Sequence, residues 1–303
     1  MAVDVLGLGC CAVDDILYVD HYPAADSKIE VCRRERRCGG LTAVALMSAA
    51  QFGASCQFAG TLGGDELSRF VLGAMRDQGV DTSTTIVRAE ARPVHSTIIV
   101  DERTGARTIL YGTHGVFGAD ETQPSAELIR SARVLFIDQY GITGAIRAAR
   151  IARGAGIPVV ADLEAEHLPR FAELLNLVDH LILSRDFAAR ITGQSDPANA
   201  AHRLWNEERA AVVVTAGKEG CFYIDRNSHK PQHCPAFSVA TVDTTGCGDV
   251  FHGVYAAALS RDLPLPERLR LASAAAALKA ARAVGHSGIP TASEITRFLN
   301  VPH

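Results

Sequence analysis

One short stretch combines the residue types that phosphoryl transfer requires. Residues 242–253, VDTTGCGDVFHG, place Gly246 and Gly248 immediately before the carboxylate of Asp249, and an apolar helical pattern follows over 249–259. Glycines let a backbone approach a ligand closely, and the amides at the start of a helix attract negative charge. A carboxylate at the same place can take the proton of an attacking hydroxyl. By itself the stretch also fits an ordinary strand-to-helix turn that Asp249 only caps.

The chain around this loop alternates short apolar runs with helical patterns. Four such runs lie at 133–138, 157–162, 180–184 and 210–215. Continuous Val, Ile and Leu runs that are separated by helices predict parallel strands covered on both faces. We therefore expect a single domain over residues 1–303, with a three-layer α/β fold and a mostly parallel central sheet flanked by helices.

Two segments interrupt this alternation with pairs of exposed, partly polar strands. One pair is predicted over 14–23 and 28–38, and the other over 94–112. Such strands do not fit between parallel core strands, so we expect a small β-sheet that stands off the domain as a lid, formed by about 12–38 and 92–113. Hairpins at the edge of the main sheet are the alternative. A lid of this kind also offers strands that can pair in a homodimer.

Composition and charge argue against several classes of protein. The net charge is −4 with scattered basic residues, which disfavours a nucleic-acid surface, and no run of about 18 apolar residues predicts a membrane span. The N-terminus lacks the basic region of a signal peptide. Eight cysteines without a CxxC pair predict free thiols in a reducing, cytoplasmic compartment. His229, His233 and Cys234 lack a fourth zinc ligand at the usual spacing.

The segment GLGCCA, at 7–12, imitates a dinucleotide-binding fingerprint, with an acid at Asp26 further along. That fingerprint needs a helix that starts at the glycines. The residues that follow, VDDILYVD, alternate as in a strand. We therefore expect a second strand there, and no NAD-dependent oxidoreductase.

Four segments, in order, resemble the signatures of one family. DTTGCGDVFHG resembles the C-terminal signature of the PfkB, or ribokinase-like, carbohydrate kinases. Residues 38–70 resemble its N-terminal signature, 212–224 its nucleotide-side strand and turn, and 278–290 the segment that closes over adenine. The resemblance covers nearly the whole chain. It implies a kinase that uses ATP and Mg²⁺ to phosphorylate a primary hydroxyl of a sugar or nucleoside.

The resemblance also implies roles for single residues on the catalytic and nucleotide sides. Asp249 takes the place of the family's general base, and its anion hole corresponds to Gly246, Cys247 and Gly248. Cys247 departs from the small residue that is usual there. The residues that correspond to the nucleotide side are Ser184, Thr215, Gly217, Gly220 and Gly285.

Two pairs of oxygen-bearing side chains are candidates for holding cations. Asp243 and Thr245 match positions that often hold a monovalent cation such as K⁺, and local turn hydrogen bonding explains them equally well. Many members carry an N-x-x-E motif that organises Mg²⁺, but SRDF stands in its place at 184–187. Asp162 and Glu164, at the end of another predicted strand, are candidates for organising Mg²⁺ through water. Hydrogen bonding at the sheet edge is the alternative for this pair.

On the sugar side, Asp14 matches the aspartate that holds substrate hydroxyls, and Gly39 and Gly40 match the glycine pair that lets a sugar approach. Val44 stands where the family often has an asparagine that binds a sugar hydroxyl. The resemblance therefore implies that this contact is lost, or that Thr42 supplies it.

Likeness to two groups within the family narrows the substrate. Several segments resemble those of ketohexokinases. GDVFHG resembles the corresponding segment of bacterial sulfofructose kinases, and Lys28 matches a lysine that those enzymes place near the sulfonate. Tyr111 and Tyr140 stand where those enzymes have an asparagine and an arginine, which argues against a sulfonate. Arg107, on the predicted lid, reaches phosphate or faces solvent. We expect a ketose or related sugar as substrate; a nucleoside kinase and a non-catalytic sugar or nucleotide sensor on the same fold are the alternatives.

Overall fold

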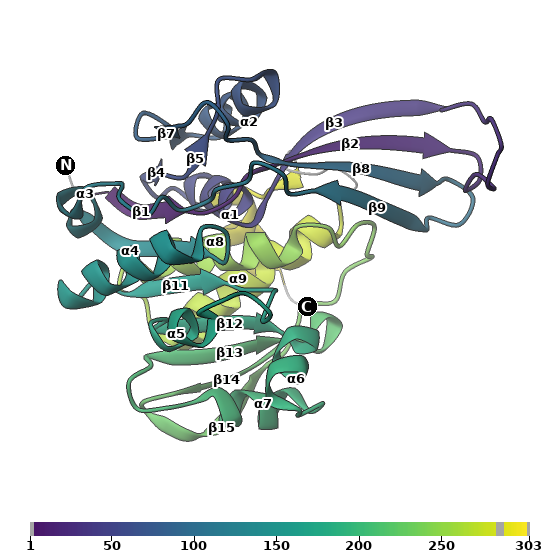
Figure 1. Ribbon diagram of the computed structural model, residues 1–303. Helices are drawn as coiled ribbons and strands as arrows, with labels where there is room; N and C mark the ends of the chain where they lie inside the picture. The colour runs from purple at the N-terminus through teal and green to yellow at the C-terminus, as the bar shows by residue number, and fades with distance from the viewer. Residues whose placement is uncertain (1–2, 283–287, 302–303) are drawn as a thin grey trace.

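A sheet of nine strands forms the centre of the computed structural model, which describes residues 3–282 and 288–301 (Figure 1). In spatial order its strands are β15 (Ser228–Cys234), β14 (Cys221–Asp225), β13 (Ala211–Thr215), β12 (His180–Ser184), β11 (Val159–Asp162), β10 (Ala132–Asp138), β1 (Val3–Leu8), β4 (Cys56–Phe58) and β6 (Val80–Asp81). Neighbouring strands from β6 to β13 pair in parallel, whereas β14 and β15 add in antiparallel orientation. This is the mostly parallel sheet that the alternation of apolar runs and helices predicted.

Helices cover both faces of this sheet, because successive strand residues point to opposite sides. Val134 packs into the core on one face, and Leu135 packs into the core on the other. The first face is covered by α1 (Leu41–Gln51), α2 (Glu66–Asp77), α8 (Cys247–Leu259), α9 (Leu265–Ala280) and α10 (Ala292–Leu299). The second is covered by α3 (Ala126–Arg130), α4 (Ile142–Gly154), α5 (Phe171–Asn176), α6 (Arg185–Thr192) and α7 (Pro197–Leu204). The three layers are those expected from the sequence.

Helices α1 and α8 touch backbone to backbone. A Cβ atom added at Gly253 of α8 would lie 2.1 Å from the carbonyl oxygen of Ala45 in α1. Real Cβ atoms do not approach an oxygen so closely, so the two helices can pack this tightly only around a glycine. This contact therefore fixes the distance between the N-terminal ends of the two helices.

A second, four-stranded sheet projects away from this body (Figure 1). Its strands, in spatial order, are β3 (Arg33–Gly39), β2 (Ala12–Val19), β8 (Val94–Asp101) and β9 (Arg107–Gly112). We call it the small sheet; it is separate from the main sheet, as the interrupted alternation predicted. A further pair, β5 (Thr61–Leu62) and β7 (Ile86–Val87), lies near α2.

The segment after GLGCCA is a strand, β2, and the first helix begins only at Leu41. The dinucleotide-binding reading, which needs a helix at these glycines, therefore has no structural basis. Over residues 3–282 and 288–301, none of the helices has the length and apolar character needed to cross a membrane.

Candidate active site

The first turn of α8 forms the wall between two cavities. Gly246 and Asp249 line the small-sheet cavity, about 380 Å³ in volume, which lies between the small sheet and the ends of α8 and α9. Cys247 and Gly248 line the turn cavity, about 370 Å³ in volume, which lies beside the turn that joins β13 to β14. Gly246 is the N-cap residue with φ +74°, a left-handed conformation that favours glycine. One helix end therefore belongs to both cavities.

Asp249 has a second carboxyl group as its neighbour. One side of Asp249 lines the small-sheet cavity, and its carboxyl group is hydrogen-bonded to that of Asp162, a buried residue at the end of β11. Removal from bulk water and the nearby charges of Asp162 and Glu164 raise the pKa of Asp249 well above its usual range, and His252 opposes them. Burial also raises the pKa of Asp162. Two like charges in contact resist ionising together, so the pair retains a shared proton in a pH range where exposed carboxyl groups are charged.

His252 lies behind this pair with oxygen acceptors at both ring nitrogens. Its Nδ1 is 2.8 Å from the carbonyl oxygen of Gly248 and 3.2 Å from Asp162 Oδ2. Its Nε2 is 3.1 Å from the carbonyl oxygen of Ile182. These contacts fix the ring between the first turn of α8 and the ends of β11 and β12.

The small-sheet cavity places the predicted sugar-side residues around one space. Asp14, Gly39, Gly40, Val44 and Arg107 all line it. Burial raises the pKa of Asp14, against a hydrogen bond from Ser96 and the charge of Arg37. A Cβ atom at Gly39 would lie 2.6 Å from Asp14 Oδ2, so the glycine leaves room for this carboxyl group.

The turn cavity contains three of the residues that were predicted on the nucleotide side. Thr215, Gly217 and Gly220 line it, opposite small residues of α9 such as Ala276. A Cβ atom at Gly220 would lie 2.1 Å from the carbonyl oxygen of Cys234. Only a glycine therefore permits this close turn against β15.

Asp243 lies between two cationic side chains at the edge of the small-sheet cavity. Arg107 Nη1 is 3.1 Å from Asp243 Oδ1 and also donates to the hydroxyl of Thr245. Lys279 Nζ is 4.0 Å from Asp243 Oδ2. Burial raises the pKa of Asp243, but hydrogen bonds from Thr245, the charge of Lys279 and a hydrogen bond from Arg107 outweigh it, so the pKa is lowered. Because protein cations already face both oxygens of this carboxylate, the side chains present do not fit the K⁺ site that was predicted at Asp243 and Thr245.

Several predicted residues lie outside both cavities. Thr42 is fully buried and its hydroxyl donates to Asp138 Oδ2 at 2.8 Å, so it does not replace the missing asparagine. Lys28 is exposed on the loop between β2 and β3, and Ser184 caps α6. Glu164 is exposed just beyond β11. Gly285 lies outside the described residues.

We expect Thr42→Val to lower stability and not sugar affinity. Asp138 is buried, which raises its pKa to about 6, and Thr42 is one of its hydrogen-bond donors. Loss of a buried hydrogen bond to a charged group costs about 1–3 kcal/mol. Asp138 is charged at pH 8 and largely neutral at pH 5, so urea unfolding should show the greater cost at pH 8. Thr42→Ser keeps the hydroxyl and is the control; a raised sugar KM with unchanged stability would contradict this assignment.

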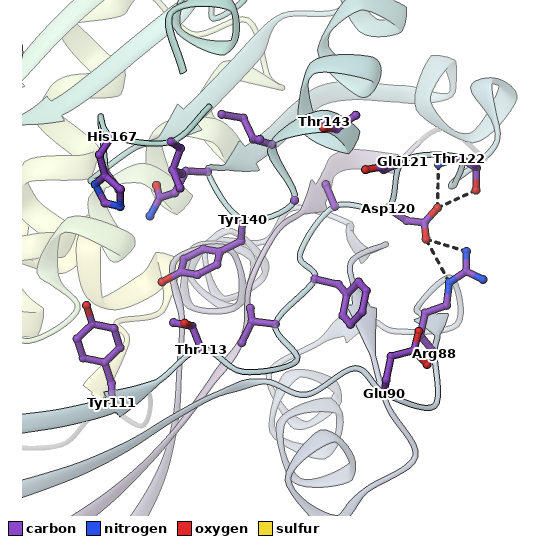
Figure 2. Close-up of a pocket in the computed structure, with 18 residues that line it drawn as sticks. Arg88, Glu90, Tyr111, Thr113, Asp120, Glu121, Thr122, Tyr140, Thr143 and His167 are labelled. Carbon is purple, nitrogen blue, oxygen red and sulfur yellow. Dashed lines mark hydrogen bonds and ion pairs between the residues drawn. The ribbon is translucent and has the colours of Figure 1, made fainter. Parts of the chain in front are cut away.

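A third cavity, about 910 Å³ in volume, opens beside the base of the small sheet (Figure 2). Tyr111 and Tyr140 point their hydroxyl groups into the same part of it, and His167 lies across from them. Burial raises the pKa of Tyr140, so this phenol is neutral. At the opposite end, Arg88 Nη2 forms an ion pair with Asp120 at 2.8 Å.

The third cavity neighbours the small-sheet cavity along strand β9. Arg107 and Ile109 line the small-sheet cavity, and Tyr111, two residues further along the same face, lines the third one. Strand β9 therefore contributes side chains to both cavities.

Three buried polar residues of this region were missed from the sequence. They are Asp138, His252 and Lys279. His252 lies inside the quoted signature, and Lys279 is the one lysine in the apolar run AAAALKAA. A charged residue in such a run was a signal for a buried cation.

Comparison with known proteins places this geometry in a family. A profile of the pfkB family carbohydrate kinases matches residues 4–292. The chain belongs to this family and is a carbohydrate kinase. A ribokinase of Haemophilus influenzae is 25% identical over 300 residues, which cover 96% of this chain and 97% of that protein. Fructokinase-1 of Zea mays is 25% identical over 288 residues, which cover 86% of this chain and 88% of that protein.

Solved structures show the same fold. A ribokinase of Arabidopsis thaliana complexed with ribose and ATP superposes with a TM-score of 0.89 at 22% identity, covering 100% of both chains. A ribokinase of Thermotoga maritima superposes with a TM-score of 0.87 at 22% identity, covering 99% of this chain and 100% of that chain. The fold is therefore ribokinase-like, with the large sheet and the small separate sheet in common.

Proposed function

We propose that the protein transfers the γ-phosphoryl group of ATP to a primary hydroxyl of a ketose or related sugar. The observation that carries this proposal is the position of the first turn of α8, which lines one cavity through Asp249 and the other through Gly248. A sugar in the small-sheet cavity and a nucleotide in the turn cavity would meet across this turn. The ribokinase of Arabidopsis thaliana, which shares the fold, is complexed with ribose and ATP, and this supports the pairing of ligands.

In this proposal Asp249 accepts the proton of the attacking hydroxyl, since it faces the small-sheet cavity. The amides and the positive end of α8, over Gly246, Cys247 and Gly248, stabilise the transferring phosphoryl group. Asp14 binds sugar hydroxyls at the opposite wall of the cavity. The small sheet acts as the lid that keeps water from the reacting groups.

The side chains of the cavity favour a neutral sugar over a sulfonated one. Four cationic side chains line the cavity, and each has a carboxylate beside it: Arg33 and Arg37 are ion-paired with Glu35, and Arg107 and Lys279 lie against Asp243. In the third cavity, Tyr111 and Tyr140 offer phenol hydroxyl groups. A sulfonate needs several cationic or strong donors, whereas phenols suit the hydroxyls of a ketose. The similarity to a fructokinase is consistent with this choice.

Mg²⁺ would enter this site with the phosphates of ATP. Among residues 3–282 and 288–301 there is no cluster of three or more His, Cys, Asp or Glu side chains that could hold a metal. Asp162 is buried against Asp249, so we propose that it acts on this base and not on the metal. When bound, Mg²⁺ supplies charge neutralisation to the phosphates. We propose no K⁺ ion at Asp243, because Arg107 and Lys279 already face its carboxylate.

An ADP-release assay with ATP and Mg²⁺ across fructose, other ketoses, ribose, sulfofructose and nucleosides tests the proposal. We expect the highest kcat/KM for a ketose. Preference for a nucleoside would replace the sugar assignment. Calorimetric binding of a sugar without any turnover would instead support the sensor alternative.

We also propose that the protein is a cytoplasmic homodimer that associates through the small sheet. Three successive apolar residues of β9, Ile109, Leu110 and Tyr111, are exposed, and apolar residues on an edge strand are suited to pairing. The cysteines of the chain are free thiols, which suits a reducing compartment that also supplies ATP. Sedimentation equilibrium tests the dimer, and a monomer at micromolar concentration would reject it.

A further inference from the structure

Lys279 is a buried ammonium group that lacks a hydrogen-bond partner among the described residues. It lies in the last turn of α9, and its side chain is only 2% exposed. An ammonium group carries three donors, and burying such a charge is costly unless it is compensated. Its nearest opposite charge is Asp243, with 4.0 Å between Nζ and Oδ2. Lys279 is therefore a cation whose position needs an explanation.

The side chain is directed toward the start of the loop over 243–248, which we call the anion loop. It lines the small-sheet cavity together with Asp243, Gly246 and Asp249. Its aliphatic part packs against Gly288, where an added Cβ atom would lie 3.3 Å from Lys279 Cδ. The packing holds the ammonium group toward Asp243.

Asp243 connects α9 to the anion loop. Its backbone N–H and that of Val242 donate to the carbonyl oxygen of Ala280, at 3.1 and 2.8 Å. Its Oδ1 accepts from the backbone N–H of Thr245 at 2.9 Å. A positive charge beside Asp243 therefore stabilises the backbone that leads directly into Gly246 and the first turn of α8.

We propose that the ammonium of Lys279 replaces a monovalent metal cation at the start of the anion loop. The enzyme then carries its own cation at Asp243 and does not depend on K⁺. Arg107 also contacts Asp243, but it belongs to the small sheet and its side chain is 42% exposed, whereas Lys279 belongs to the body. The kinetic consequence rests on the proposed function; the consequence for stability does not.

The experiment compares KCl with tetramethylammonium chloride at equal ionic strength, by ADP release and by thermal unfolding. For the wild type we expect kcat/KM to agree within about twofold between the two salts, and Tm to agree as well. Lys279→Ala opens space for an ion, so its kcat/KM should fall about tenfold or more in tetramethylammonium and recover with K⁺ or NH₄⁺. Its Tm should rise with K⁺ concentration, because an ion that binds only the folded state stabilises it.

Two further variants sharpen the comparison. Lys279→Met removes the charge but fills the space, so it should lose activity without recovery by K⁺. Lys230→Ala removes an exposed lysine of β15 and should behave as the wild type. Activation of the wild type by K⁺ of about fivefold or more, or a Lys279→Ala protein that neither K⁺ nor NH₄⁺ restores in Tm, would overturn the proposal. If no sugar is turned over, the proposed function fails while the Tm comparison still decides the role of Lys279.

Discussion

Replacing Asp249 with asparagine should lower kcat by about 10²–10⁴-fold, the usual cost of removing a general base. Asparagine keeps the shape of the side chain but cannot accept the proton of the attacking hydroxyl. The glycines before it and the end of α8 remain, so the KM values for ATP and sugar should stay within about threefold. Steady-state ADP release, with either ligand varied, measures both quantities.

Asp77→Asn is the matched control for this change. It makes the same chemical substitution at the exposed last residue of α2, away from both cavities, and should leave kcat unaltered. Equal Tm values for the two variants would separate a catalytic loss from unfolding. An Asp249→Asn enzyme that keeps the kcat of the wild type would show that another group is the base.

Replacing Asp162 with asparagine should shift the pH dependence of kcat, while the variant still catalyses the reaction. In the wild type, Asp249 must lose its proton before it can act, and burial together with Asp162 raises its pKa. The activity should therefore rise with pH through a range above that of an ordinary carboxyl group. The variant removes the neighbouring negative charge, and the new amide can donate to the charged form of Asp249. Both effects lower the pKa of Asp249, so the rise in activity should shift to lower pH.

The profile of kcat against pH for wild type and Asp162→Asn gives the answer, with sugar and ATP saturating. Glu164→Gln, which changes a more distant and exposed carboxylate, should give a smaller shift in the same direction. An unmoved profile with an increased requirement for Mg²⁺ would mean that Asp162 serves the metal. A loss of kcat as large as that of Asp249→Asn would mean that Asp162 is itself the base.

The fold was largely predictable because its signals are local. Apolar runs such as 133–138 and 210–215 mark buried parallel strands by composition alone, and they became β10 and β13. The anion loop was equally visible, since the glycines and Asp249 are consecutive. Local spacing is sufficient where one turn supplies all the groups.

Contacts between distant segments could not be predicted in the same way. Asp162 was recognised as the end of a strand, but its hydrogen bond to Asp249 depends on how β11 meets α8. Thr42 was assigned to the sugar, yet the direction of its hydroxyl is decided by a buried partner on β10. Lys279 needed the packing of α9 to show which way the ammonium points. In each case the deciding quantity is a side-chain direction across two elements.

The close contact of Gly253 with Ala45 has a consequence for the alignment of the reactants. Helix α1 begins beside Gly40 and carries Val44 into the proposed sugar cavity, whereas the first turn of α8 carries the proposed base, Asp249. In the proposed function, the separation of these helices thus sets how far the sugar hydroxyl lies from Asp249. An error of about 1 Å in such a distance costs roughly 10²-fold in rate. Gly253 lines none of the three cavities, but through this distance it can affect the rate as much as the residues that line the proposed sugar cavity.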